Sequence, residues 1–128
     1  MKNLDSQSAH IENRLPCGAS NPYLVMASVL AAGLDGLKNK IEPPAETQGI
    51  GYSLTGVTDL PTRLEQSLNA LEADSTLRVA LGEEFIKLFV AVKRHELGKA
   101  KAAIQNYDSS DFNNTVDEWE RNEYFEFL

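Results

Sequence analysis

The sequence has a single cysteine, Cys17, among its 128 residues. A lone cysteine excludes a disulfide within the chain and is typical of proteins from a reducing compartment. With only two histidines, His10 and His95, and no Cys-x-x-Cys pair, we expect no self-contained zinc site. The first nine residues, MKNLDSQSA, lack the apolar core of a signal peptide, so we expect a cytoplasmic protein.

Basic residues are also scarce, with 12 lysines and arginines against 19 acidic residues and a net charge of −7. Affinity for nucleic-acid phosphates comes mainly from clustered basic side chains, so no nucleic-acid partner is expected. The uncharged stretch from Leu15 to Leu34 is broken by Pro16, Gly18 and Pro22, which leaves 13 residues from Pro22 onward. That length is too short to cross a bilayer, so no membrane association is expected.

Side chains alternate in character from Ala9 to Leu15, which predicts a β-strand. No second strand is predicted, so we expect this strand to pair with another molecule or to be disordered. Asn21 is a suitable helix cap and Pro22 a suitable first helical residue, which predicts a helix from Pro22 to about Lys40. Apolar residues lie nearly all round this helix, so we expect it to be buried on most sides.

Residues 42–60 are rich in proline and glycine and are interpreted as a long loop. Further helices are predicted from Pro61, from Ser75 to Leu81, from Glu83 to about Gln105, and after a capping box of Thr115 and Glu118. The predicted core is Leu64, Leu68, Leu71, Leu77, Leu81, Phe85, Phe89, Trp119 and Tyr124. The predicted fold is mainly α, an N-terminal strand followed by about five helices, in a single partial domain over residues 1–128 with residues 1–8 flexible.

The alternation places three ionisable side chains, His10, Glu12 and Arg14, on one face of the predicted strand. Neighbours on such a face lie about 7 Å apart, close enough to share a pocket. A glutamate can bind a hard divalent cation, and an arginine can hold a substrate carboxylate by two hydrogen bonds. The same spacing is typical of a solvent-facing strand with a weak salt bridge, so the pattern alone leaves both interpretations open.

Longer blocks of sequence carry a resemblance to a known family. The run HIENRLPCGASNPYL, continued by AAGLDGLKNKIEPP, resembles the C-terminal part of the glutamine synthetase family, in which Glu-x-Arg precedes Asn-Pro-Tyr-Leu. The blocks LPTRLEQSLNALEAD, ALGEEFIKLFVAVKRHEL and VDEWERNEYFEFL agree with that family in order. The IENRLP form and the Trp-Glu-Arg ending are most similar to the branch that contains γ-glutamyl-amine ligases.

The resemblance implies an ATP-dependent ligase that joins ammonia or an amine to glutamate through γ-glutamyl phosphate, with Mg²⁺ or Mn²⁺ holding the nucleotide. By position, Glu12 corresponds to a metal ligand, and Arg14 to an arginine that contacts glutamate and the transferring phosphoryl group. His10 replaces an arginine of the nucleotide site. The turn from Cys17 to Ser20 departs from the usual Gly-Ala-Asp-Ala. The rings of subunits in this family imply a homo-oligomer, or association through the strand edge.

Members of this family are several times longer, so the resemblance implies a truncated segment without most of the active site. We expect the isolated chain to be inactive, because Glu12 alone cannot neutralise and position the phosphates of ATP. Three hypotheses follow: a section of a ligase, a non-catalytic binding or assembly module, or a small-molecule binder that keeps part of a nucleotide or amino-acid pocket.

Overall fold

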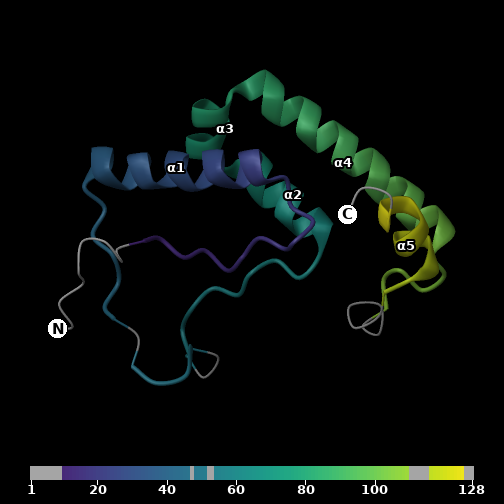
Figure 1. Ribbon diagram of the computed structural model, residues 1–128, viewed down its shortest axis with the longest axis horizontal. Helices are drawn as coiled ribbons and strands as arrows, with labels where there is room; N and C mark the ends of the chain where they lie inside the picture. The colour runs from purple at the N-terminus through teal and green to yellow at the C-terminus, as the bar shows by residue number, and fades with distance from the viewer. Residues whose placement is uncertain (1–9, 47, 52–53, 110–115, 126–128) are drawn as a thin grey trace.

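A computed structural model describes residues 10–46, 48–51, 54–109 and 116–125, and these residues form five α-helices (Figure 1). The helices are α1 (Pro22–Asn39), α2 (Leu64–Ala73), α3 (Ser75–Leu81), α4 (Glu83–Ala103) and α5 (Glu118–Tyr124). The mainly α fold predicted from the sequence is confirmed. Among the described residues, no helix combines the length and apolar character that crossing a membrane requires.

The helices begin where local side-chain chemistry allows them to begin. Asn21 caps α1, because its Oδ1 accepts hydrogen bonds from the backbone N–H groups of Tyr23 and Leu24 at 3.0 and 3.3 Å. Asp74 caps α3 through the N–H of Leu77 at 2.9 Å. The predicted starts of α1, α3 and α4 are confirmed, whereas α2 begins at Leu64 rather than near Pro61.

Local interactions also determine where α5 begins and where α1 ends. Asp117 and Glu120 form a capping box at the start of α5, and the predicted cap Thr115 lies outside the described residues. Helix α1 ends because Lys40 adopts a left-handed conformation with φ of 52°. The N–H of Lys40 then bonds to the carbonyl of Leu37 and that of Ile41 to the carbonyl of Gly36, which is a Schellman motif.

The strand predicted over Ala9–Leu15 is wrong for the part of it that the structure describes. Residues 10–15 are not in a strand, their side chains are exposed, and the segment runs back beneath α1 before it turns into that helix (Figure 1). An alternating pattern specifies a strand only when a neighbouring strand supplies the hydrogen-bonding partners. The predicted flexible residues 1–8 lie outside the described residues. Between α1 and α2, the described residues of the stretch 42–60 form no α-helix or strand and are exposed.

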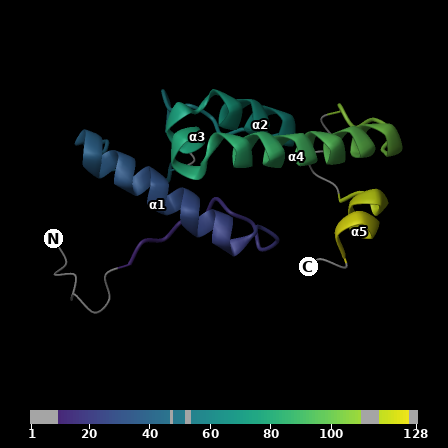
Figure 2. The same ribbon diagram turned by 90° about the horizontal axis from the view of Figure 1, so that it is seen from above.

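The hydrophobic core lies where α2 packs against α4, and α3 closes one end of it (Figures 1 and 2). Leu68 from α2 meets Ile86 and Val90 from α4, and each of the three side chains is at most 3% exposed. Leu71, Leu81 and Phe89 pack around them. The burial predicted for Leu68 is therefore confirmed. The predicted core residues Leu71, Leu81 and Phe89 also lie at the core, where they are partly buried.

The buried face of α4 extends further along the helix than the predicted core residues Phe85 and Phe89. Leu97, Ala100 and Ile104 are buried beyond the predicted set, because they continue the spacing of Ile86 and Val90 along one face of the helix. Phe85 lies one position away from that face, about 100° round the helix, and is 39% exposed. Leu64, in the first turn of α2, is also 39% exposed. Burial was wrongly predicted for these two side chains, whereas Leu77, Trp119 and Tyr124 are half-buried.

Helix α1 departs most from prediction. Among the described helices it contacts only α3, and none of its residues is buried. Figure 2 shows α1 on one side of the layer that α2, α3 and α4 form. The exposed large apolar side chains of α1 are Tyr23, Met26, Leu30, Leu34 and Leu37, whereas Leu24, Val25 and Val29 are half-buried. The expected burial on most sides is therefore wrong, because the described residues supply only one packing partner.

Helix α5 contacts the second half of α4 through a hydrogen bond and an ion pair, and carries an aromatic pair of its own. Trp119 and Tyr124 of α5 meet edge to face with ring centroids 6.1 Å apart. The hydroxyl of Tyr124 donates to Glu96 Oε2 at 3.2 Å, and Lys99 pairs with Glu123. Burial and the neighbouring Glu96 carboxylate raise the pKa of Tyr124 to about 12, so this hydroxyl stays protonated as a donor.

Removing a side chain from the core is expected to destabilise the α2–α4 unit. Ile86→Ala leaves a cavity beside Leu68 and should lower the free energy of unfolding by about 2–5 kcal/mol, measured by urea denaturation followed by circular dichroism. Leu88→Ala is the control, because Leu88 is on the same helix and 65% exposed. It should change stability by less than about 0.5 kcal/mol. Equal losses in the two variants would contradict this assignment of the core.

Candidate active-site segment

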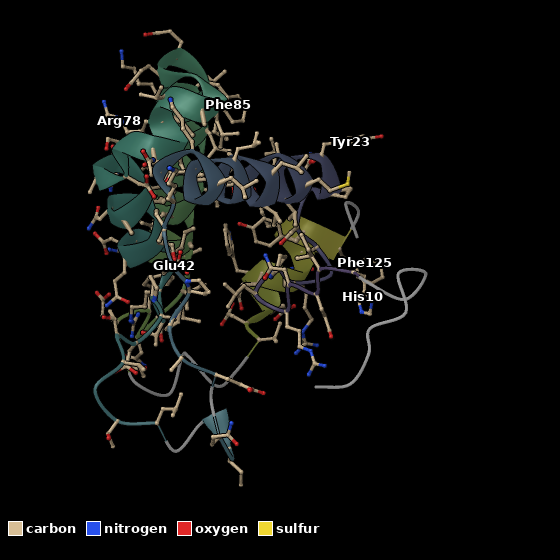
Figure 3. The ribbon with its side chains drawn as sticks, turned by 90° about the vertical axis from the view of Figure 1, so that its left-hand side faces the viewer. His10, Tyr23, Glu42, Arg78, Phe85 and Phe125 are labelled. Carbon is tan, nitrogen blue, oxygen red and sulfur yellow. The ribbon has the colours of Figure 1, made fainter. Side chains whose placement is uncertain are left out.

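The three predicted site residues lie on the extended segment that leads into α1. His10, Glu12 and Arg14 are all exposed, with side-chain exposures of 57% for Glu12 and 85% for Arg14. Figure 3 shows the ring of His10 on this extended segment. The site is therefore an open surface feature within the described part of the chain.

The structure brings Glu12 and Arg14 together. Arg14 Nε donates a hydrogen bond to Glu12 Oε1 at 2.6 Å, so the guanidinium and the carboxylate form an ion pair. A charge-assisted bond of this kind orients both groups, but between two exposed side chains it contributes little to stability. Glu12 keeps a second carboxylate oxygen, and Arg14 keeps two further nitrogens, with which each could contact a ligand.

A short turn connects this pair to α1. The N–H of Ser20 bonds to the carbonyl of Cys17 at 3.0 Å, and Asn21 then caps the helix. Hydrogen bonds from the Ser20 side chain and from the backbone of Ala19 hold the pKa of the Cys17 thiol below its usual value. The turn and the cap together fix the direction in which the segment with Glu12 and Arg14 enters α1.

The described residues do not form a complete metal site. Within them, no group of three or more histidine, cysteine or acidic side chains is placed to hold a cation. Mg²⁺ requires six oxygen ligands in near-octahedral geometry, and Glu12 can supply only one or two of them. Glu12 could therefore act only as one ligand of a larger set, which the described residues do not complete.

The described surface also has a cavity of about 220 Å³ far along the sequence from these residues. It is lined by Glu72, Arg78, Glu83, Ile86 and Lys87. The Arg78 guanidinium donates to Glu83 Oε2 at 2.7 and 3.1 Å and to the Glu72 carbonyl at 3.2 Å. Lys87 and the Glu72 carboxylate pair with Glu84 and Arg94, so each charged group of the lining has a partner. The cavity contains none of the three predicted site residues.

Sequence reasoning missed one arginine that the structure shows to be well connected. Arg63, just before α2, donates to the carbonyls of Tyr107 and Ser109 at 2.8 and 3.0 Å and lies 5.9 Å from the centre of the Tyr107 ring. It ties the turn after α4 back to the start of α2. Hydrophobic periodicity gives no signal for such a residue, because its partners are backbone carbonyls more than 40 positions away.

Fold and site together define a class: a helical segment that presents an exposed carboxylate–guanidinium pair just before its first helix. A family model described as glutamine synthetase, catalytic domain, matches residues 2–122. The chain therefore belongs to the glutamine synthetase family, as the resemblance implied.

Curated relatives agree with this membership. Gamma-glutamylanilide synthase from Acinetobacter sp is 39% identical over 122 residues, which cover 94% of this chain and 24% of that protein. Glutamine synthetase from Pyrococcus abyssi is 36% identical over 91% of this chain and 28% of its own length. Lengsin from Homo sapiens is 42% identical over 77% of this chain and 20% of its own length. The chain thus spans about a quarter of the length of these relatives, and no solved structure matches it significantly.

The exposed Arg14 and the well-connected Arg63 should differ in their contribution to stability, and we expect unfolding measurements to show the difference. Arg14→Gln should change the free energy of unfolding by less than about 0.5 kcal/mol, because the pair with Glu12 is exposed to solvent. Arg63→Gln removes charged hydrogen bonds to two carbonyls and should cost about 1–3 kcal/mol. Urea denaturation of both variants tests this, and a comparable loss from Arg14→Gln would mean that Arg14 supports the fold.

Proposed function

We propose that this chain forms the C-terminal part of the catalytic domain of an ATP-dependent ligase that couples glutamate to ammonia or to an amine. One observation carries the proposal: the family match over residues 2–122 includes Glu12 and Arg14, which lie side by side and accessible in front of α1. The name of the Acinetobacter relative, a gamma-glutamylanilide synthase, supports an amine as well as ammonia among the candidate acceptors.

Within such a ligase, each residue of the segment has a distinct task. Glu12 would contribute a carboxylate oxygen to Mg²⁺ or Mn²⁺, and the bound cation would neutralise the charge of the ATP phosphates. Arg14 would hold the carboxylate of glutamate and the oxygens of the transferring phosphoryl group. His10 would face the nucleotide with an imidazole, which has fewer donors than the arginine usual at this position.

The 128 residues by themselves are proposed to be inactive. Phosphoryl transfer depends on holding the donor, the acceptor and the metal in fixed positions. Glu12 and Arg14 are exposed on an extended segment, and the described residues offer no cluster that would complete the cation site. Tight binding of ATP, glutamate or a cation is therefore not expected from this chain alone.

Assay of the purified 128-residue chain tests this part of the proposal directly. With Mg²⁺, ATP, glutamate and an amine, we expect no γ-glutamyl product above the background of a mock purification. Titration with Mn²⁺, followed by electron paramagnetic resonance, should give only weak binding. Turnover, or tight Mn²⁺ binding that Glu12→Gln abolishes, would show that this segment is a self-sufficient site.

A chimera tests whether the segment is competent when the rest of a catalytic domain is present. The matching region of the Acinetobacter gamma-glutamylanilide synthase would be replaced by this chain. We expect measurable ligase activity, and Glu12→Gln should lower kcat about a hundredfold or more by removing a metal ligand. Glu46→Gln, an exposed glutamate outside the segment, is the matched control and should leave kcat unchanged. An active chimera in which Glu12→Gln has no effect would remove Glu12 from the site.

A second candidate function is a non-catalytic binding or assembly module. The observation that favours it is the wide apolar face that α1 leaves uncovered among the described residues. Association with other copies of the chain and a cytoplasmic location both remain predictions. An inactive but well-folded chimera would favour this second candidate over the ligase.

A further inference from the structure

Asn13 lies between the paired residues Glu12 and Arg14, and its side chain closes a turn around Arg14. The Oδ1 atom of Asn13 accepts a hydrogen bond from the backbone N–H of Leu15 at 3.1 Å. A side-chain oxygen bonded to the N–H group two positions further on forms an Asx turn, in which it takes the place of a backbone carbonyl. Arg14 is the residue enclosed by this turn, so the turn restricts its backbone dihedral angles.

A second constraint acts on the other side of Arg14. Leu15 precedes Pro16, and a residue before proline is restricted to extended conformations by contact with the proline ring. Pro16 is half-buried, whereas the described residues from 10 to 15 are exposed. The backbone on both sides of Arg14 is therefore restricted by local chemistry, although this segment packs little and has no strand partner among the described residues.

We propose that Asn13 is a positioning residue, whose turn around Arg14 holds the guanidinium against the carboxylate of Glu12. Arg14 Nε and Glu12 Oε1 lie 2.6 Å apart, although both side chains are more than half exposed. An exposed ion pair between long side chains is weak by itself, because ordering them costs side-chain entropy. A turn that restricts the backbone between the two residues lowers this cost. The consequence for catalysis rests on the proposed ligase function, whereas the turn and the ion pair do not.

An asparagine suits this position because it closes the turn without adding charge. Its amide oxygen accepts the N–H of Leu15, and the neutral side chain competes little for the guanidinium. An aspartate could close the same turn, but a second carboxylate beside Arg14 would compete with Glu12 for its N–H groups. A serine can close the turn more weakly through its hydroxyl, and an alanine has no acceptor. Substitutions at this one position can therefore separate the turn from its charge.

Within the proposed site, the turn would set the direction in which Arg14 meets glutamate. Glu12 accepts from Nε of Arg14, which leaves the two terminal nitrogens for carboxylate or phosphoryl oxygens. A guanidinium held at Nε presents these nitrogens in a restricted orientation. Binding would then require less ordering, because the competent arrangement is already populated in the free protein.

Nitrogen-15 NMR of the 128-residue chain tests the turn and the ion pair without an activity assay. Glu12→Gln should move the Arg14 Nε–Hε resonance, and the size of this movement, here called the coupling, reports the native pair. In an Asn13→Ala background, Glu12→Gln should move the resonance at most about half as much. The exchange rate of the Leu15 N–H with water should also rise about threefold or more, because its acceptor is removed.

Other variants separate the turn from a general effect of substitution. Asn13→Ser should restore most of the coupling, whereas Asn13→Asp should keep the slow exchange of Leu15 and lower the coupling. Asn39→Ala is the matched control, because Asn39 is also exposed and its side chain donates to Asp35 Oδ1 at 2.7 Å, at the far end of α1. It should change neither signal. Unchanged coupling in Asn13→Ala, or an equal loss in Asn39→Ala, would overturn the positioning role.

The chimera with the Acinetobacter gamma-glutamylanilide synthase tests the consequence for catalysis. If the turn falls to about a tenth to a third of its population, Asn13→Ala should raise KM for glutamate about three- to tenfold. Asn13→Ser should restore KM, and Asn39→Ala should leave KM and kcat unchanged. A chimera that is inactive, or indifferent to Glu12→Gln, would refute the ligase function, and the NMR result would still decide the turn. A chimera that needs Glu12 but keeps its KM for glutamate in Asn13→Ala would refute the positioning role alone.

Discussion

Packing of α2 against α4 is the contact on which the described structure depends. Leu68, Ile86 and Val90 exclude water between these two helices, and the short α3 follows because it must connect the end of one to the start of the other. Among the described helices, α1 attaches to this unit only through α3, and α5 attaches only through α4. Each outer helix therefore depends on a core to which it contributes no buried side chain.

Ion pairs surround this core and help to determine how α2 is aligned along α4, which apolar contact alone does not specify. Arg94 of α4 reaches Glu72 and Asn69 of α2, and Lys101 of α4 pairs with Glu65 of α2 at 2.8 Å. Exposed pairs of this kind are individually weak, but pairs at both ends of α2 disfavour sliding of one helix along the other. Arg63 completes the set by binding backbone carbonyls that follow α4. The register of α2 against α4 is thus fixed by polar groups and its stability by apolar ones.

Local features of the fold could be predicted from sequence, and longer-range features could not. The caps Asn21 and Asp74 predict where their helices begin. In each cap the side chain accepts a hydrogen bond from a backbone N–H group only two or three positions further along the chain. The predictions of a strand at residues 10–15 and of a buried α1 were wrong for the same reason. Both features depend on packing or hydrogen-bonding partners that a local sequence pattern does not specify. For the site, the spacing of Glu12 and Arg14 indicated that they could share a pocket, and the structure places them in contact. The role of Arg63 could not be predicted, because its hydrogen-bond partners are backbone carbonyls far along the chain.

Helix α1 links the two surfaces on which function is proposed. Its N-terminus fixes the segment that carries Glu12 and Arg14, and its outer face carries exposed apolar side chains. Any polypeptide that covers these side chains would limit the positions open to Glu12 and Arg14. Covering a hydrophobic helix and ordering a pair of charged ligands would then be two consequences of a single contact.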